Sequence, residues 1–152
     1  PLEAFPLNPQ VYWIVGDTGA TGHPKEAVSS IAAKKKKKNP QPYRDAISRL
    51  GTFALTAKSA IEANDPSQLG ELMNQAHAVL SFLDVSSPDL DRLVSAARFA
   101  GALGAKLTGG GRGGCMIALA RNRSEAEKIE EAIRQAGAIR TWIYQMGGTE
   151  DV

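Results

Sequence analysis

The chain has 152 residues, of which 43% are hydrophobic and 22% are charged, so it can bury the core of one compact domain and is unlike a disordered chain. The formal net charge is +2, and residues 34–38 are all lysine, so most of the basic excess is local, which argues against a nucleic-acid binder. The single cysteine excludes an internal disulfide, and no stretch approaches the ~18 apolar residues of a membrane span. We expect a soluble, cytoplasmic protein. Because it begins with Pro1 rather than Met, we also expect a fragment of a longer chain.

The N-terminal part predicts a linker, a strand and a helix. Three prolines within residues 1–10 favour an extended linker, and the β-formers of residues 11–15 predict a strand. Residues 16–22 contain three glycines that can adopt positive φ and are predicted to form a loop. Pro24 suits the first turn of a helix, which we expect to end within residues 39–42.

Three further helices follow, because apolar residues recur at intervals of three and four. Asp65-Pro66 and Ser87-Pro88 are start signals for the second and third, since Asp and Ser cap helices and Pro needs no amide partner at the first helical position. We expect the three to form an antiparallel bundle. Their apolar positions are Ile47, Leu50, Ala54, Ala57 and Ile61; Leu69, Leu72, Met73, Ala76, Val79, Leu80 and Leu83; and Leu90, Leu93, Val94 and Ala97.

The last third predicts two strands around a glycine-rich segment, then a helix and a strand. The strands cover residues 106–108 and 115–120. Ser124 with Glu127 predicts a capping box for a helix that reaches about residue 135, Gly137 ends it, and residues 139–144 form the last strand. This order predicts an α+β fold, in which a helical bundle packs on a four-stranded antiparallel, ferredoxin-like sheet. We expect a domain over residues 11–146 and a flexible tail over 147–152.

The glycine-rich segment is the strongest functional signal. Five of the six residues between Thr108 and Cys115 are glycine, and glycine loses more conformational freedom on folding than any other residue. Close approach of backbone amides to phosphate oxygens is the usual compensation. The segment lacks the Gly-Lys-Ser/Thr end of a Walker A loop, and an apolar strand rather than a helix follows it, unlike a dinucleotide fingerprint. A flexible hairpin turn is the alternative, although a hairpin needs only about two loop residues.

The flanking residues turn this segment into a recognisable motif: Lys106-Leu107-Thr108-Gly109-x-Gly111-x-Gly113-Gly114-Cys115. It resembles the third conserved motif of the GHMP kinases (galacto-, homoserine, mevalonate and phosphomevalonate kinases). The Lys-Leu-Thr start and the Cys end are most similar to the mevalonate kinases, of bacterial type. Gly110 and Arg112 depart from the commonest form, which has Ala and Gly there. We expect Arg112 to point to solvent rather than to phosphate, because bacterial-type enzymes of the family tolerate side chains at this position.

The likeness extends upstream to about residue 11 and downstream to about residue 144. It includes residues 15–19, 24–28, 73–77, 83–91 and 102–105. The resemblance implies a GHMP kinase C-terminal domain, and with it ATP-dependent phosphorylation of the primary alcohol of mevalonate in the isoprenoid pathway, with Mg²⁺ present.

In the family, the phosphate loop, the base aspartate, the metal-binding carboxylate and an active-site lysine lie in the N-terminal half, and none of those motifs occurs in this sequence. We therefore expect no catalytic residue and no metal ligand here, and no activity of the isolated chain. The N-terminal kinase domain is its expected partner, and a homodimer is left open. The residues implied to bind ATP phosphates are Thr108, Gly109, Gly110, Gly111, Gly113 and Gly114, and those implied on the substrate side are Asp17, Thr18 and Lys106.

Two alternatives remain open. One is phosphomevalonate kinase or another GHMP kinase, because the residues that select the substrate lie mostly in the N-terminal half. The other is a ferredoxin-like regulatory module that binds a metabolite without transferring a group. Such a module would not need four consecutive helices between its first two strands.

Other polar residues have a structural and a functional interpretation. Asp17 can form an Asx-type turn. His77 is expected to be packed or hydrogen-bonded rather than a metal ligand, since no second ligand has suitable spacing. Cys115 is expected to be buried as a small hydrophobe. Ser86 and Ser87 most simply cap the helix that follows, although Ser86 could also reach a ligand.

Overall fold

The computed structural model describes residues 11–21, 40–83, 85–108 and 113–146. The elements within these ranges confirm the predicted α+β architecture. The predicted linker over residues 1–10, the helix that starts at Pro24 and the tail over 147–152 lie outside the described residues. In chain order the elements are β1 (Val11–Thr21), α2 (Pro40–Glu62), α3 (Pro66–Phe82), α4 (Pro88–Phe99), β2 (Gly104–Thr108), β3 (Gly113–Ala120), α5 (Arg123–Gln135) and β4 (Arg140–Met146).

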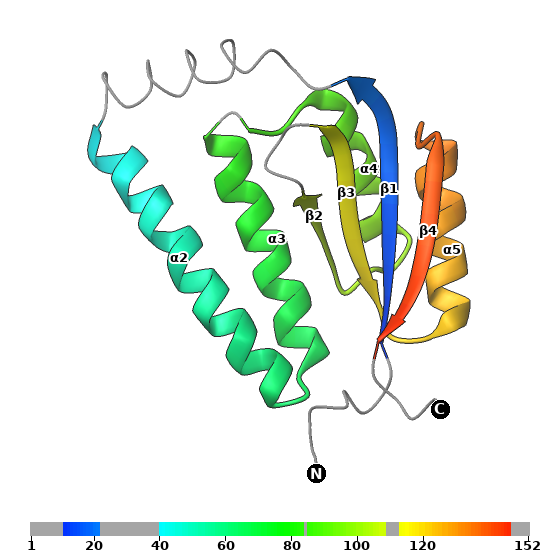
Figure 1. The fold of residues 1–152 in the computed structure, drawn as a ribbon, viewed down its shortest axis with the longest axis horizontal. Helices are drawn as coiled ribbons and strands as arrows, with labels where there is room; N and C mark the ends of the chain where they lie inside the picture. The colour runs from blue at the N-terminus through cyan, green and yellow to red at the C-terminus, as the bar shows by residue number, and fades with distance from the viewer. Residues whose placement is uncertain (1–10, 22–39, 84, 109–112, 147–152) are drawn as a thin grey trace.

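The strands form one antiparallel sheet in the order β2-β3-β1-β4 (Figure 1). Alternate residues of a strand point to opposite faces, and the two faces differ in cover. The face that carries Ile14 and Met116 packs against α4 and α5 in the largest core cluster. The other face carries Val11 and, on β4, Trp142. It joins a second cluster with α2 and α3, but Trp142 remains 39% exposed, so this face is covered only in part.

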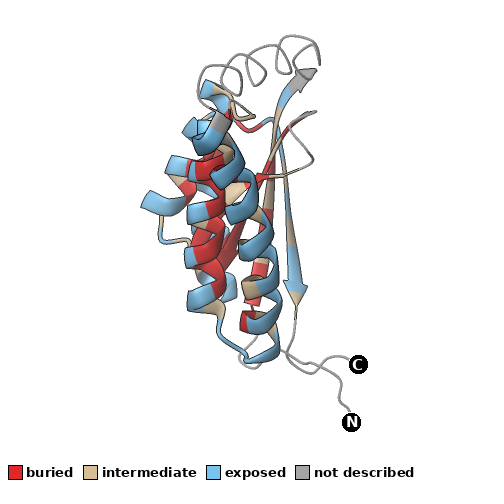
Figure 2. Cartoon of the chain, turned by 90° about the vertical axis from the view of Figure 1, so that its left-hand side faces the viewer, coloured by how far each residue is buried: buried red, intermediate tan, exposed pale blue. Residues whose placement is uncertain are grey.

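The helices divide into two groups. α2 and α3 form an antiparallel pair beside the β2 edge of the sheet (Figure 1), and the buried residues of α3 form a stripe that faces inward (Figure 2). α4 packs instead against α5 and the sheet. The predicted bundle of three consecutive helices is therefore wrong for α4, because its apolar residues Leu90, Leu93 and Val94 complete the core beneath the sheet.

The predicted helix starts are confirmed for α3 and α4 but not for α5. The carboxylate of Asp65 accepts a hydrogen bond from the amide of Gln68 at 3.1 Å, and Ser87 Oγ accepts one from the amide of Leu90 at 3.2 Å. At α5 the cap is Asn122, whose Oδ1 accepts from the amide of Glu125 at 2.8 Å. The predicted capping box of Ser124 and Glu127 is therefore wrong, because the helix begins before Ser124 and places it inside the first turn.

The boundaries of four elements differ from the prediction. β1 continues to Thr21, so residues 16–21 are strand rather than loop, with a register irregularity between Asp17 and Thr21. Pairing with β3 on one side and β4 on the other extends the strand despite its glycines. α2 begins at Pro40, so Pro40 and Pro42 lie in its first turn. β2 and β3 each begin two residues earlier than predicted, at Gly104 and Gly113.

One backbone contact sets the distance between α3 and the sheet. Gly70 lies within α3 and Gly104 begins β2. A Cβ atom added to Gly104 would overlap the backbone of Gly70, and one added to Gly70 would overlap the backbone of Leu103. Glycine is needed at both positions because the two backbones touch.

We expect Gly104→Ala to lower the free energy of unfolding by about 1–3 kcal/mol or more, because α3 must move away from β2. The matched control is Gly51→Ala in α2, where an added Cβ meets no atom within 4 Å; we expect it to stabilise the chain by about 0.5–1 kcal/mol. Urea unfolding followed by circular dichroism measures both. Equal stability of Gly104→Ala and the parent chain would contradict the contact.

Candidate functional site

The glycine-rich segment connects strands that meet at one end of the sheet, the upper end in Figure 1. β2 ends there at Thr108, which pairs with Cys115 of β3. Cys115 also pairs with Asp17 of β1, and Asp17 pairs with Arg140 at the start of β4. These four residues form one row across the partly covered face of the sheet, and we call it the end row.

The predicted phosphate-binding residues fall on both sides of the described boundary. Thr108 is half-buried at the end of β2, and Gly114 is buried in β3. Gly113 begins β3 and pairs with Thr21 of β1. The remaining predicted residues, Gly109, Gly110 and Gly111, lie outside the described residues, as does Arg112.

Asp17 ties β1 to the edge strand β4 at the end row. Its Oδ1 accepts a hydrogen bond from the amide of Gly19 at 2.8 Å, and its Oδ2 accepts one from Arg140 Nη2 at 3.1 Å. Its backbone carbonyl accepts from the amide of Ile139 at 2.8 Å. Oδ1 therefore makes the local Asx-type contact that the sequence left open, while Oδ2 joins β1 to β4.

Thr18 and Lys106 are not brought together. Thr18 lines a small cavity of about 110 Å³ with Asp89 and Arg92 of α4, on the face opposite to Asp17. Lys106 lies on the same face as Asp17 and lines a cavity of about 370 Å³ between α2 and α3, whose other lining residues are apolar or aromatic. Its Nζ donates to the carbonyl of Leu107 at 2.9 Å, and burial lowers the pKa of its ammonium group.

Cys115 is half-buried in the end row rather than fully buried as predicted, because its face of the sheet is covered only in part. Burial raises the pKa of its thiol, the negative charge of Asp17 raises it further, and Arg140 opposes them. The thiol is therefore protonated at neutral pH, and the end row holds no activated sulfur nucleophile.

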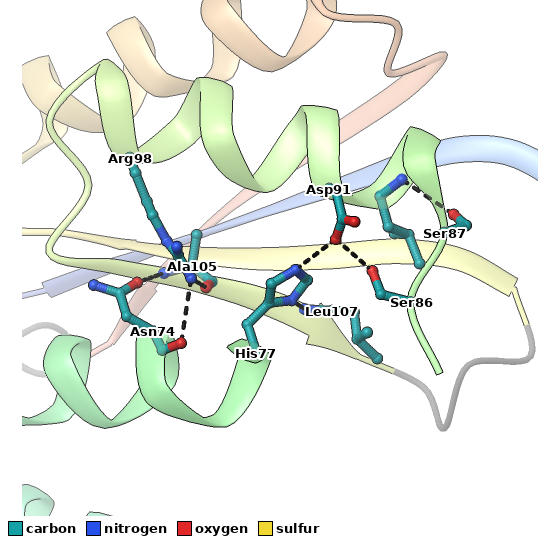
Figure 3. Close-up of polar contacts among 9 residues, drawn as sticks. Asn74, His77, Ser86, Ser87, Asp91, Arg98, Ala105 and Leu107 are labelled. Carbon is teal, nitrogen blue, oxygen red and sulfur yellow. Dashed lines mark hydrogen bonds and ion pairs between the residues drawn. The ribbon is translucent and has the colours of Figure 1, made fainter. Parts of the chain in front are cut away.

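A polar cluster supports the end row from the β2 edge (Figure 3). His77 is buried on α3 and accepts a hydrogen bond at Nδ1 from the amide of Leu107 at 3.1 Å. Its Nε2 lies 2.9 Å from Asp91 Oδ1. The prediction of a hydrogen-bonded structural histidine is confirmed. The sequence did not single out Asp91 or Arg98, both on α4. An acidic residue in the first turn and a basic residue in the last turn of a helix are favoured by the helix dipole. This ordinary explanation hid their contacts with His77 and Ala105.

The described residues contain no group of three or more His, Cys, Asp or Glu side chains that could hold a metal ion. In the same part of the chain, none of the helices has the length and apolar character needed to cross a membrane.

Comparison with known proteins identifies the family. The family model "GHMP kinases C terminal" matches residues 57–139, more than half of the chain. A mevalonate kinase of Pyrococcus horikoshii is 43% identical over 131 residues, which cover 83% of this chain and 38% of the relative. A galactokinase of Roseiflexus sp. is 44% identical over 85 residues, which cover 55% of this chain and 22% of that relative. The crystal structure of L. major mevalonate kinase in complex with R-mevalonate has a TM-score of 0.81 at 28% identity and covers 98% of this chain and 46% of that one.

The chain therefore belongs to the GHMP kinase family and corresponds to the family's C-terminal domain. It spans less than half the length of these relatives. The comparison does not support the expected bacterial type, because the Pyrococcus relative is archaeal.

Cys115 is the only thiol in the chain, so its alkylation reports on the end row. We expect the rate–pH profile with iodoacetamide to give an apparent pKa above the ordinary ~8.5. Asp17→Asn should lower this apparent pKa and Arg140→Gln should raise it, because each removes the charge named above. An apparent pKa that neither variant moves would contradict the juxtaposition.

Proposed function

We propose that this chain forms the C-terminal part of a mevalonate kinase, which transfers the γ-phosphoryl group of ATP to the primary alcohol of mevalonate and yields 5-phosphomevalonate. The 43% identity to the Pyrococcus horikoshii mevalonate kinase over 83% of the chain carries the proposal. The motif from Lys106 to Cys115 supports it, because the strands on either side of the glycine-rich segment meet in the end row. Since the chain covers 38% of that relative, the activity requires the part outside it.

In this proposal the glycine-rich segment presents backbone amides to the phosphates of ATP. Thr108 leads into the segment and Gly113 and Gly114 lead out of it, so the flanking strands determine where its ends lie. The roles of Gly109, Gly110 and Gly111 rest on the motif alone, and Arg112 is proposed to face solvent.

The acceptor side is proposed to lie along the partly covered face. Lys106 and Asp17 share this face and would form part of the wall beside the acceptor. The side chain of Thr18 faces α4 instead, so any contribution of Thr18 to that wall would come from its backbone.

Phosphoryl transfer by this family uses Mg²⁺, which neutralises phosphate charge when bound. The family resemblance supports placing the metal ligands and the catalytic base in the N-terminal kinase domain. The role of this chain in the proposal is to bind and orient the nucleotide.

We propose residues 11–146 as the domain, residues 1–10 as the linker to the N-terminal domain and residues 147–152 as a tail. We propose the cytoplasm as the location of the protein.

Another acceptor within the family is the second candidate. The galactokinase relative has 44% identity, although over only 55% of the chain, and phosphomevalonate kinase remains an alternative of the same kind. The regulatory module loses its support, because the family match includes three of the described helices and the glycine-rich motif.

A chimera tests the proposal. We expect that replacing the corresponding C-terminal part of the Pyrococcus horikoshii mevalonate kinase with this chain gives an enzyme that releases ADP with mevalonate, and not with galactose or phosphomevalonate. The 152-residue chain alone should give no turnover above background, because it lacks the phosphate loop motif. A coupled ADP-release assay measures all four reactions.

Within the chimera, Gly111→Val should raise the KM for ATP by about tenfold, because a side chain there would block close approach of the backbone to phosphate. Gly51→Ala, on the exposed side of α2, should leave it unchanged. A folded chimera that releases no ADP with mevalonate, or turnover by the isolated chain, would overturn the assignment.

A further inference from the structure

The free edge of β2 is covered by side chains rather than by another strand. β2 is an edge strand, and β3 pairs with it on the inner side. On the outer side, Ala105 donates its amide hydrogen to Asn74 Oδ1 at 3.0 Å and its carbonyl accepts from Arg98 Nη2 at 3.1 Å. Leu107 donates its amide hydrogen to His77 Nδ1 at 3.1 Å, and its carbonyl accepts from Lys106 Nζ at 2.9 Å. Each outward backbone group of Ala105 and Leu107 therefore has a side-chain partner.

The contact between His77 and Leu107 defines the protonation state of the imidazole. An amide hydrogen can be accepted only by a ring nitrogen that carries no proton, so Nδ1 is bare and Nε2 carries the hydrogen. Nε2 donates that hydrogen to Asp91 Oδ1 at 2.9 Å. Ser86 Oγ donates to the same oxygen at 2.7 Å, so the carboxylate is itself held in place. The pair is therefore a hydrogen bond from a neutral imidazole and not an ion pair.

The chain of contacts joins three elements to one point of the sheet (Figure 3). His77 comes from α3, Asp91 from α4, and Ser86 from the segment that precedes α4. All of them act on Leu107, which lies one residue before Thr108 and the end row. Loss of the acceptor at Nδ1 would free the last outward amide of β2 before the glycine-rich motif.

We propose that His77, held in one tautomer by its contacts with Leu107 and Asp91, is a positioning residue that fixes the Leu107–Thr108 end of β2 for nucleotide binding. The effect on nucleotide binding rests on the proposed function, whereas the contacts of His77 with Leu107 and Asp91 do not. His77 does not contact the nucleotide in this proposal; it acts through Leu107. Its expected effect is therefore on ATP binding and not on the chemical step.

Protonation of His77 would break the arrangement, because both ring nitrogens of an imidazolium are donors. The charged groups brought to His77 by the described elements are Asp91 and Arg98 of α4 and Lys106 of β2. Burial lowers the pKa of His77 most, Arg98 and Lys106 lower it further, and Asp91 opposes them through its hydrogen bond and its charge. The net shift is downward from 6.5, which keeps the imidazole neutral near pH 7.

Two substitutions separate the two halves of the contact. In His77→Asn, the amide oxygen occupies the place of Nδ1 and can still accept from Leu107, but the side chain is too short to reach Asp91. In His77→Gln, the amide nitrogen occupies the place of Nε2 and can still donate to Asp91, but nothing accepts from Leu107. Both variants remove the ring, so a difference between them reports the Leu107 contact rather than lost packing.

The first measurement uses the 152-residue chain and does not depend on activity. We expect long-range ¹H–¹⁵N spectra to show His77 protonated at Nε2 only, and hydrogen exchange to show Leu107 protected. His77→Gln should lower the protection factor of Leu107 at least tenfold, and His77→Asn should lower it by less than threefold. Equal protection of Leu107 in the two variants, or a proton on Nδ1, would overturn the proposal.

The second measurement uses the chimera described above. We expect His77→Gln to raise the KM for ATP about tenfold while kcat changes less than twofold, and His77→Asn to change neither by more than twofold. If the unsubstituted chimera lacks kinase activity, the proposed function fails while the exchange experiment still decides the geometry. If the chimera is active and both variants have the same KM, the positioning role is wrong.

The same contact predicts a pH dependence. In the unfolded chain His77 has its ordinary pKa of about 6.5, and in the folded chain the pKa is lower, so the unfolded state binds the proton first. The stability due to this contact is complete above pH 6.5 and is lost as the pH falls toward the lowered pKa.

We expect the protection factor of Leu107 to fall over the same pH range. Asp91→Asn should move this loss to lower pH, because it removes the groups that raise the pKa, and His77→Asn should abolish it. A loss that persists unchanged in His77→Asn would assign the pH dependence to another group and overturn this part of the proposal.

Discussion

The docking of α3 onto the edge of β2 is the contact on which the rest of the domain depends. Gly70, Asn74 and His77 are spaced by four and three residues, so they lie along one face of α3. Gly70 touches the start of β2, Asn74 reaches Ala105, and His77 reaches Leu107. No side chain separates the two backbones at Gly70. The side chains of Asn74 and His77 are therefore close enough to form hydrogen bonds with β2 directly.

This arrangement replaces a strand partner with side chains. An edge strand normally presents unpaired amides and carbonyls that invite another chain, and proteins cover or interrupt such edges. Here the side chains of His77, Asn74 and Arg98 cover the edge of β2. Of these groups only the imidazole of His77 is buried, and the cost of its burial is offset because it makes hydrogen bonds there. The same groups connect α3, α4 and β2, so helices that belong to two different core clusters act on one strand.

The sequence predicted what depends on neighbours along the chain. The apolar spacing identified α3 and α4 through residues that are buried in the structure, such as Leu72 and Leu93, and the caps at Asp65 and Ser87 were read from local signals. The residues on either side of the glycine-rich segment predicted its two flanking strands. These features follow from periodicity and from turn chemistry, both of which act within a few residues.

What escaped prediction depends on contacts between distant segments. Gly70 would ordinarily weaken a helix, and the approach of Leu103 and Gly104 at the start of β2 explains it. β1 extends past its glycines because strands pair with it on both sides. Arg98 bonds the carbonyl of Ala105, and Asp91 orients His77, although either residue could serve as an ordinary helix-end charge. At α5 two capping residues were available, and the structure uses Asn122 rather than Ser124.

These contacts also suggest how a C-terminal domain can contribute to a kinase through positioning alone. Phosphoryl transfer depends on positioning and on charge stabilisation more than on covalent chemistry by the protein, and small displacements of a positioned group are costly. Glycine loses more conformational freedom on folding than any other residue, so the strands that flank the glycine-rich motif matter for where its ends lie. Asp17 and Arg140 hold the end row across β1 and β4, while His77 and Asp91 hold it at β2. The end row is thus held from both edges of the sheet.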